Sequence, residues 1–160
     1  KGCWCMYWRI TRSEFGRQCG EGNRRAMAEL IAAGHVPGIL GYAGGRPIAW
    51  CSVAPRADFS VLDRSPTLKR VDDLPAWSIT CFFISRPYRG QGLSAALIAA
   101  AVDYARENGA RVLEAYPIAT EKAASAAPER YTGILSTFEK AGFRLAVQRS
   151  ARRPIVRLYL

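Results

Sequence analysis

The residues best suited to chemistry lie in a short turn that carries an arginine and two glycines, Arg89-Gly90-Gln91-Gly92-Leu93-Ser94. The turn follows a β-favouring apolar segment and precedes an alanine-rich segment with helical spacing. The first N–H groups of a helix have no partner inside the helix, and the helix dipole makes that end positive. Gly90 and Gly92 let the backbone approach a ligand closely, and Arg89 supplies a cation with several donors. The pattern therefore predicts a phosphate-binding turn.

Other phosphate-binding motifs are not matched here. The dinucleotide fingerprint needs a third glycine, where the chain has Ala95, and an acidic residue about 20 positions later. No second strand–helix–strand unit follows, and the Gly-Lys-Ser/Thr loop of ATP-binding proteins is absent. An ordinary strand–turn–helix connection with a chance arginine is the alternative interpretation.

The elements around the turn predict an α/β fold in which helices flank a central mixed sheet. Alternating or β-favouring segments predict about seven strands, at 3–10, 38–43, 47–53, 78–85, 111–116, 144–150 and 154–160. Helical spacing predicts helices at 23–34, 93–109 and 131–141. Thr11 or Ser13 is a candidate cap of a further short helix. Residues 56–76 and 117–130 show no sustained period and are predicted loops.

Two of these strands are expected to be parallel neighbours. A helix connects 78–85 with 111–116, and such connections are right-handed crossovers between parallel strands. Alternation along the second strand places Val112, Glu114 and Tyr116 on one face. A carboxylate and a phenol hydroxyl are therefore expected to project from the same side of the sheet.

Composition limits the classes of protein that fit. The 160 residues, 49% of them apolar, suit a single folded domain over 1–160. The chain has no apolar run of about 18 residues, and residues 1–10 lack a secretory pattern, so we expect a cytoplasmic protein with no membrane partner. The net charge of +10 comes from arginines scattered along the chain, without a nucleic-acid-binding motif. We expect no nucleic-acid partner, although the charge keeps a nucleic-acid-binding domain as an alternative.

The five cysteines do not predict a disulfide framework, because their number is odd. Cys3 and Cys5 would share one face of the strand predicted at 3–10. A metal site would need further ligands, and His35, in a predicted turn, is the only histidine. We therefore expect no metal and interpret the cysteines as buried or half-buried thiols.

The turn Arg89 to Ser94, placed after Ile84-Ser85, resembles the acetyl-coenzyme-A signature of the GNAT N-acetyltransferases, Arg/Gln-x-x-Gly-x-Gly/Ala. Arg89 and Gly92 match that pattern, whereas Ser94 stands in place of the last Gly/Ala. Residues 138–143, Phe-Glu-Lys-Ala-Gly-Phe, also resemble the family's Tyr-Glu-Lys-x-Gly-Phe segment. With the order of elements, the resemblance covers nearly the whole chain. It implies the GNAT fold, with a splay between two parallel strands.

This resemblance implies acetyl transfer from acetyl-CoA to an amine of a small molecule or a protein. The residues that it assigns to acetyl-CoA are Phe82, Phe83, Ile84, Arg89, Gly90, Gln91, Gly92, Leu93 and Ser94. The strand residues would pair with pantetheine, and the turn would bind the diphosphate. An N–H near Phe83 or Ile84 is the expected donor to the thioester oxygen. A homodimer is common in the family and is a possibility here.

The acceptor amine must lose a proton before it attacks the thioester. Glu114 is the first candidate for the base, because a short apolar strand would raise its pKa. The alternative is that Glu114 points to the rim and pairs with an arginine.

The departing thiolate needs a proton, and the tyrosine that the family usually offers is replaced by Phe138. Tyr131 and Tyr116 are the candidate acids, with Ser136 or solvent as further possibilities. The missing tyrosine also suggests an alternative function, a non-catalytic module that binds acetyl-CoA as a sensor.

Overall fold

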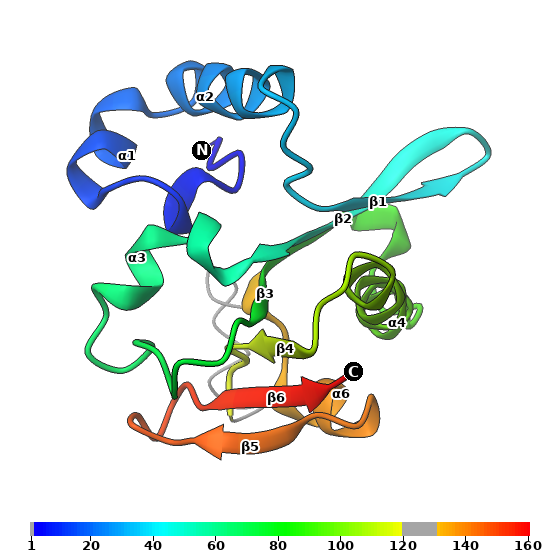
Figure 1. The fold of residues 1–160 in the computed structure, drawn as a ribbon. Coiled ribbons are helices and arrows are strands. Elements are labelled where there is room, and N and C mark those ends of the chain that lie inside the picture. The colour runs from blue at the N-terminus through cyan, green and yellow to red at the C-terminus, as the bar shows by residue number, and fades with distance from the viewer. Residues whose placement is uncertain (1, 120–130) are drawn as a thin grey trace.

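The computed structural model describes residues 2–119 and 131–160, and within them a mixed six-stranded sheet forms the centre of the molecule (Figure 1). The strands lie in the order β1-β2-β3-β4-β6-β5. Their bounds are β1 Ile39–Ala43, β2 Arg46–Pro55, β3 Trp77–Ile84, β4 Val112–Ala115, β5 Arg144–Val147 and β6 Ile155–Tyr159. Neighbours are antiparallel except β3 and β4, which are parallel. The predicted mixed α/β sheet and its parallel pair are confirmed.

Helices flank this sheet on both faces. They are η1 Met6–Trp8, α1 Arg12–Gln18, α2 Glu21–Ala32, η2 Arg56–Asp58, α3 Ser60–Asp63, η3 Arg86–Tyr88, α4 Leu93–Glu107 and α6 Leu135–Lys140. Thr11, one of the two predicted candidate caps, caps α1 through a capping box with Glu14. Among the residues that the structure describes, no helix is both long and apolar enough to cross a membrane.

The strand predicted at residues 3–10 is wrong, and its absence accounts for six strands instead of about seven. The segment forms η1, and its N–H groups are satisfied locally, with Met6 N donating to Cys3 O at 3.0 Å. Trp4 and Cys5 have positive φ values of 48° and 52°, which a strand does not allow. Trp8 is buried in a cluster with Phe59, so tertiary packing overrides the β-propensity of the aromatic residues.

Two further boundaries differ from the prediction. The last helix begins at Leu135 rather than at 131, because Gly133 has a φ of 83° and Ile134 is extended and bridges to Ile118. Residues 56–76 are not a plain loop, since they contain η2 and α3. Part of the predicted 117–130 loop, residues 120–130, lies outside the described residues.

A β-bulge marks the place where β3 and β4 separate. Val53 of β2 lies opposite Ile79, but Ser52 lies opposite Cys81, so that Thr80 is an extra residue in β3. The parallel pairing of β3 with β4 ends at the same point, with Ile79 opposite Ala115. From Thr80 to Ile84, β3 has no strand partner on that side within the described residues. This is the splay that the resemblance to the family implied.

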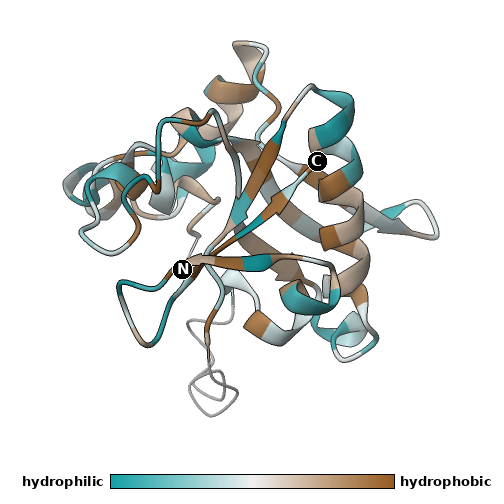
Figure 2. Cartoon of the chain, turned by 60° about the horizontal axis from the view of Figure 1, so that its bottom comes forward, coloured by the Kyte–Doolittle hydropathy of each residue, from teal (hydrophilic) through white to brown (hydrophobic). Residues whose placement is uncertain are grey.

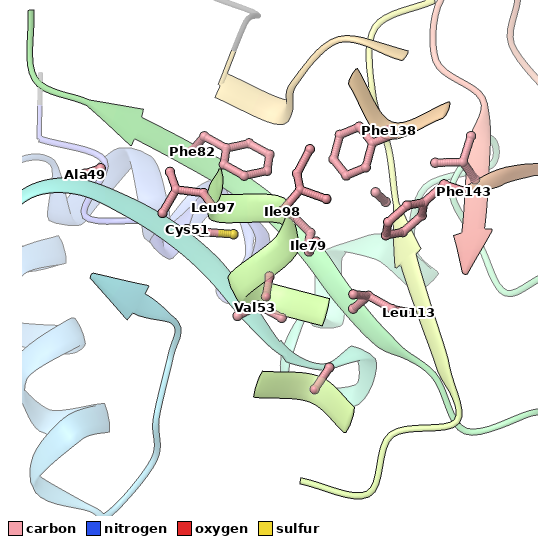
Figure 3. Packing of buried hydrophobic residues seen from close by; sticks show 14 of the residues in the cluster. Ala49, Cys51, Val53, Ile79, Phe82, Leu97, Ile98, Leu113, Phe138 and Phe143 are labelled. Atoms are coloured by element: carbon pink, nitrogen blue, oxygen red, sulfur yellow. The ribbon is translucent and has the colours of Figure 1, made fainter. Parts of the chain in front are cut away.

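The two faces of the sheet carry separate apolar cores. The apolar side of α4 covers one face and packs against residues that include Val53, Ile79 and Leu113, with Phe138 and Phe143 at one end (Figure 3). The other face, called here the N-terminal face, is covered by residues 2–32 and 56–71 and buries Trp8, Phe59 and Tyr116. In Figure 2 the central strands are mostly brown, and hydrophilic segments lie toward the outside.

Candidate functional site

The turn between β3 and α4 has the backbone geometry of an anion site. Gly90 and Gly92 both have a φ of 77°, which is the left-handed region that favours glycine. A Cβ built at either position would meet no atom within 4 Å, so the space in front of the turn is open. Glycine is therefore favoured at both positions by the backbone conformation, and not because a side chain would clash with a neighbouring atom.

Five consecutive N–H groups in this turn have no acceptor among the described residues. They belong to Gly90, Gln91, Gly92, Leu93 and Ser94. Hydrogen bonding within α4 begins only with Ala95, whose N–H donates to Gly92 O at 3.0 Å. Because α4 is 15 residues long, its dipole adds positive potential at the same place.

The side chains of the turn fix it to the end of β3. Arg89 Nε donates to Ile84 O at 2.8 Å, which holds the exposed guanidinium beside the strand end. Gln91 Nε2 donates to Pro87 O at 3.0 Å and braces η3. The cation and the free N–H groups consequently lie at one end of the unpaired strand edge.

The strand residues of the predicted site lie along that edge. Phe82, Phe83 and Ile84 pair with β2 on one side, while their β4 side carries no strand among the described residues. The Phe82 ring points to the α4 face (Figure 3), and its centroid lies 6.0 Å from the centroid of the Phe138 ring. Phe83 is 55% exposed on the N-terminal face. The structure thus joins the strand and turn residues into one continuous edge.

Glu114 does not have the apolar surroundings on which its candidacy as a base depended. Its side chain is 1% exposed, and two guanidinium groups face its oxygens. Oε1 accepts from Arg157 Nε at 2.8 Å, and Oε2 accepts from Arg56 Nη1 at 3.2 Å and from Tyr116 OH at 2.9 Å. That part of the expectation is wrong. The pairing with arginine is present, although it is buried and not at the rim.

Tyr116 belongs to the same buried network. Its hydroxyl contacts Arg56 Nη1 at 2.6 Å and Ser78 Oγ at 2.8 Å, in addition to Glu114. Burial raises the pKa of Tyr116 well above its ordinary value, and the nearby Glu114 carboxylate acts in the same direction. Three polar partners and full burial leave this hydroxyl no room for a substrate.

Tyr131 is the half-buried candidate. It precedes Gly133, where a Cβ would lie 3.2 Å from the Phe82 ring, so this segment passes the splay. Its ring lies edge-on to Tyr7 at 6.3 Å. Burial raises the pKa of Tyr131 to about 12, against the charges of Arg153 and Arg12, which lower it. Its hydroxyl therefore carries a proton over the whole physiological range.

Sequence reasoning missed the ion-pair network that surrounds Glu114. Arg56 also bonds Asp63 Oδ1 at 2.7 Å, and Arg157 bonds Asp72 Oδ1 at 2.9 Å. The network therefore ties β4 and β6 to the 56–76 segment. One signal was available, because Arg157 interrupts an apolar strand, Ile155-Val156-Arg157-Leu158, and a charge in such a place needs a buried partner.

A family model matches most of the chain. The model of the acetyltransferase (GNAT) family matches residues 4–134. A comparison with curated proteins finds no match.

Solved structures share the fold at low sequence identity. A ribosomal-protein-alanine N-acetyltransferase from Brucella melitensis is 16% identical, with 88% of this chain and 78% of that chain covered and a TM-score of 0.54. PaiA N-acetyltransferase from Thermoplasma acidophilum, in complex with coenzyme A, is 9% identical, with 98% and 84% covered and a TM-score of 0.55. An N-acetyltransferase from Staphylococcus aureus Mu50 is 15% identical, with 86% and 75% covered and a TM-score of 0.54. The matched family model and this shared fold lead to one conclusion: the chain belongs to the GNAT acetyltransferase family.

Proposed function

We propose that this protein transfers an acetyl group from acetyl-CoA to an amine of a small molecule or a protein. The observation that carries the proposal is the row of five unpaired N–H groups at the start of α4, next to the edge of β3 that no described strand covers. The N–H groups and Arg89 bind the diphosphate. The edge at Phe82 to Ile84 pairs with the amides of pantetheine, and one of its N–H groups donates to the thioester oxygen. The PaiA N-acetyltransferase from Thermoplasma acidophilum, which shares the fold, was solved in complex with coenzyme A, and this supports acetyl-CoA as the ligand.

Titration calorimetry with acetyl-CoA tests the binding part. We expect saturable heat for the wild-type protein and an affinity lower by about ten- to a hundredfold for Arg89→Ala, since a charge-assisted hydrogen bond contributes about 1.5–3 kcal/mol. Arg106→Ala, at the exposed far end of the same helix, is the matched control and should bind as the wild type does. Absence of heat with folded wild-type protein would overturn the proposal.

We assign the proton donor for the departing thiolate to Tyr131. Its hydroxyl is protonated and only partly buried, and its segment passes Phe82. Glu114 and Tyr116 have a structural role in this proposal, because their polar atoms are already hydrogen-bonded within the protein. The acceptor amine then loses its proton to water.

Tyr131→Phe is expected to lower kcat by about 10²–10⁴-fold, the usual contribution of a general acid, with little change in KM for acetyl-CoA. Release of coenzyme A thiol in the presence of an amine panel measures this effect. Tyr104→Phe, which loses the same hydroxyl beside Trp77, is the control and should keep the wild-type rate. Unchanged turnover in Tyr131→Phe would assign the acid to another group.

A non-catalytic acetyl-CoA-binding module is the second candidate. It is favoured by Phe138, which is fully buried between Phe82 and Phe143 at the place where the family usually has tyrosine (Figure 3). The same assay separates the two functions. Calorimetric binding of acetyl-CoA without release of the coenzyme A thiol in the presence of any amine of the panel would select the sensor.

A further inference from the structure

Two cysteine side chains meet beside the splay, on the N-terminal face. Cys81 directly follows the bulge residue Thr80 and directly precedes Phe82. Its thiol donates to Phe82 O at 3.8 Å and lies next to the sulfur of Cys5, which comes from the N-terminal segment. The indole Nε1 of Trp50 donates to Cys5 Sγ, at 3.0 Å. An N–H group of β2 and the thiol of Cys81 in β3 therefore both face the Cys5 sulfur atom.

A buried arginine adds positive charge to this place. The Arg9 side chain is 3% exposed, and its Nε and Nη1 atoms are buried without a hydrogen-bond acceptor among the described residues. The carboxylate with which it pairs, that of Asp58, lies 3.6 Å from Nη1, beyond hydrogen-bond distance. The Arg9 guanidinium is thus an incompletely paired cation that acts electrostatically on Cys5.

These contacts shift the pKa values of the two thiols in opposite directions. The neighbouring Cys81 thiol lowers the pKa of Cys5 against the effect of burial, and the Trp50 N–H and the Arg9 charge lower it further. The pKa of Cys81 rises, because of the neighbouring Cys5 and because Cys81 is itself buried. Cys5 is consequently the more acidic thiol of the pair.

The backbone at Cys5 holds the sulfur in this position. Trp4 and Cys5 both adopt left-handed φ values, which are uncommon for residues other than glycine. The other cysteines lack such an environment. Cys3 and Cys19 are exposed, whereas Cys51 is fully buried, which raises the pKa of its thiol.

We propose that Cys5 is an acylation site that accepts the acetyl group of acetyl-CoA. The proposal rests on the proposed function, because the thioester must lie at the splay, next to Phe82 and therefore next to Cys81. The Cys5 thiolate attacks the thioester carbonyl carbon and forms a new C–S bond. The C–S bond to coenzyme A breaks, and its electron pair leaves on the coenzyme A sulfur, which takes up a proton from Tyr131, the donor assigned above; water then returns a proton to Tyr131. One thioester replaces another, so the step needs no oxidant or reductant.

Intact-mass spectrometry after incubation with acetyl-CoA tests the site. We expect an adduct of one acetyl group that neutral hydroxylamine removes and that peptide mapping assigns to Cys5. Cys5→Ser should lose the adduct, whereas Cys19→Ser, which removes a more exposed thiol, should keep it. A protein that binds acetyl-CoA in calorimetry but forms no hydroxylamine-labile adduct, or an adduct that persists in Cys5→Ser, would overturn the inference and leave the proposed function standing.

Alkylation by iodoacetamide gives a readout that does not depend on acetyl-CoA. At neutral pH, Cys5 should react faster than the exposed Cys19, because the thiolate is the reactive form. Trp50→Phe keeps Cys5 and removes one donor to its sulfur, and it should slow alkylation at Cys5 but not at Cys19. Equal rates at the two cysteines in the wild type would refute the lowered pKa of Cys5, whatever the outcome of the acetyl-CoA titration.

Discussion

Glu114→Ala is expected to lower the free energy of unfolding by about 3–5 kcal/mol, the cost of breaking a buried ion pair from one side. The carboxylate lies between Arg56 and Arg157, whose side chains are 6% and 3% exposed. Removing it leaves two guanidiniums without the carboxylate that separates them. Asp63 and Asp72 still hold their outer nitrogens, but both are partly exposed. Urea unfolding followed by circular dichroism measures the change.

Asp103→Ala is the matched control for this substitution. Asp103 also pairs with an arginine, Arg106, at 3.1 Å, but both side chains are more than half exposed on the surface of α4. Water screens such a pair, so its loss should change stability by less than about 1 kcal/mol. If the two variants lost equal stability, the buried network would not hold β4, β6 and the 56–76 segment together.

Glu114→Gln separates the bracing role from the catalytic role that the sequence suggested. If Glu114 only stabilises the fold, Glu114→Gln destabilises the protein, and its folded fraction keeps the pH dependence of turnover. If Glu114 is the catalytic base, the same substitution abolishes turnover and leaves stability unchanged. The two roles thus predict opposite pairs of results in assays of one variant.

The strand–turn–helix unit at 77–107 could be predicted because its signals are local. Two glycines two positions apart, an arginine and a change from β to helical spacing all fall within one short stretch. The parallel partner of β3 followed from the crossover rule, and the pairing of Ser78 with Glu114 confirms it. Positive φ at Gly90 and Gly92 needs no distant contact to be inferred.

The environment of Glu114 could not be predicted in this way. Alternation correctly placed Glu114 and Tyr116 on one side, since both join the same network. Their charged partners, however, lie 58 and 43 positions from Glu114 along the chain, at Arg56 and Arg157. No spacing rule connects residues so far apart in the sequence. The arginine partners of Glu114 could therefore not be inferred, and its carboxylate was predicted to be a base.

The prediction of a strand in the N-terminal segment was wrong for a related reason. Its aromatic and apolar residues suit a strand by propensity, but the six strands of the sheet all come from residues 39–159, and the segment pairs with none of them. The segment folds instead as η1 against Phe59 and α3, and the turn before it brings Cys5 to Trp50. The prediction of a strand therefore also concealed the contact between Cys5 and Cys81.

Gly92→Val is expected to remove most acetyl-CoA binding, by more than about a hundredfold. The φ of 77° disfavours a β-branched residue, and the turn must change its course to accept one. The N–H groups on both sides of Gly92 then no longer converge, so that more than one charge-assisted hydrogen bond of about 1.5–3 kcal/mol is lost. Calorimetric titration with acetyl-CoA measures the affinity.

Gly109→Val controls for the backbone cost of this substitution. Gly109 follows the other end of α4, has a φ of 78°, and also has no atom within 4 Å of a built Cβ. Both variants should therefore lose a similar free energy of unfolding, since the conformational penalty is the same. Only Gly92→Val should lose affinity, because only its end of the helix presents unpaired N–H groups and a positive dipole to the ligand. Equal losses of affinity in the two folded variants would show that acetyl-CoA binding depends on the stability of α4 and not on the turn at its start.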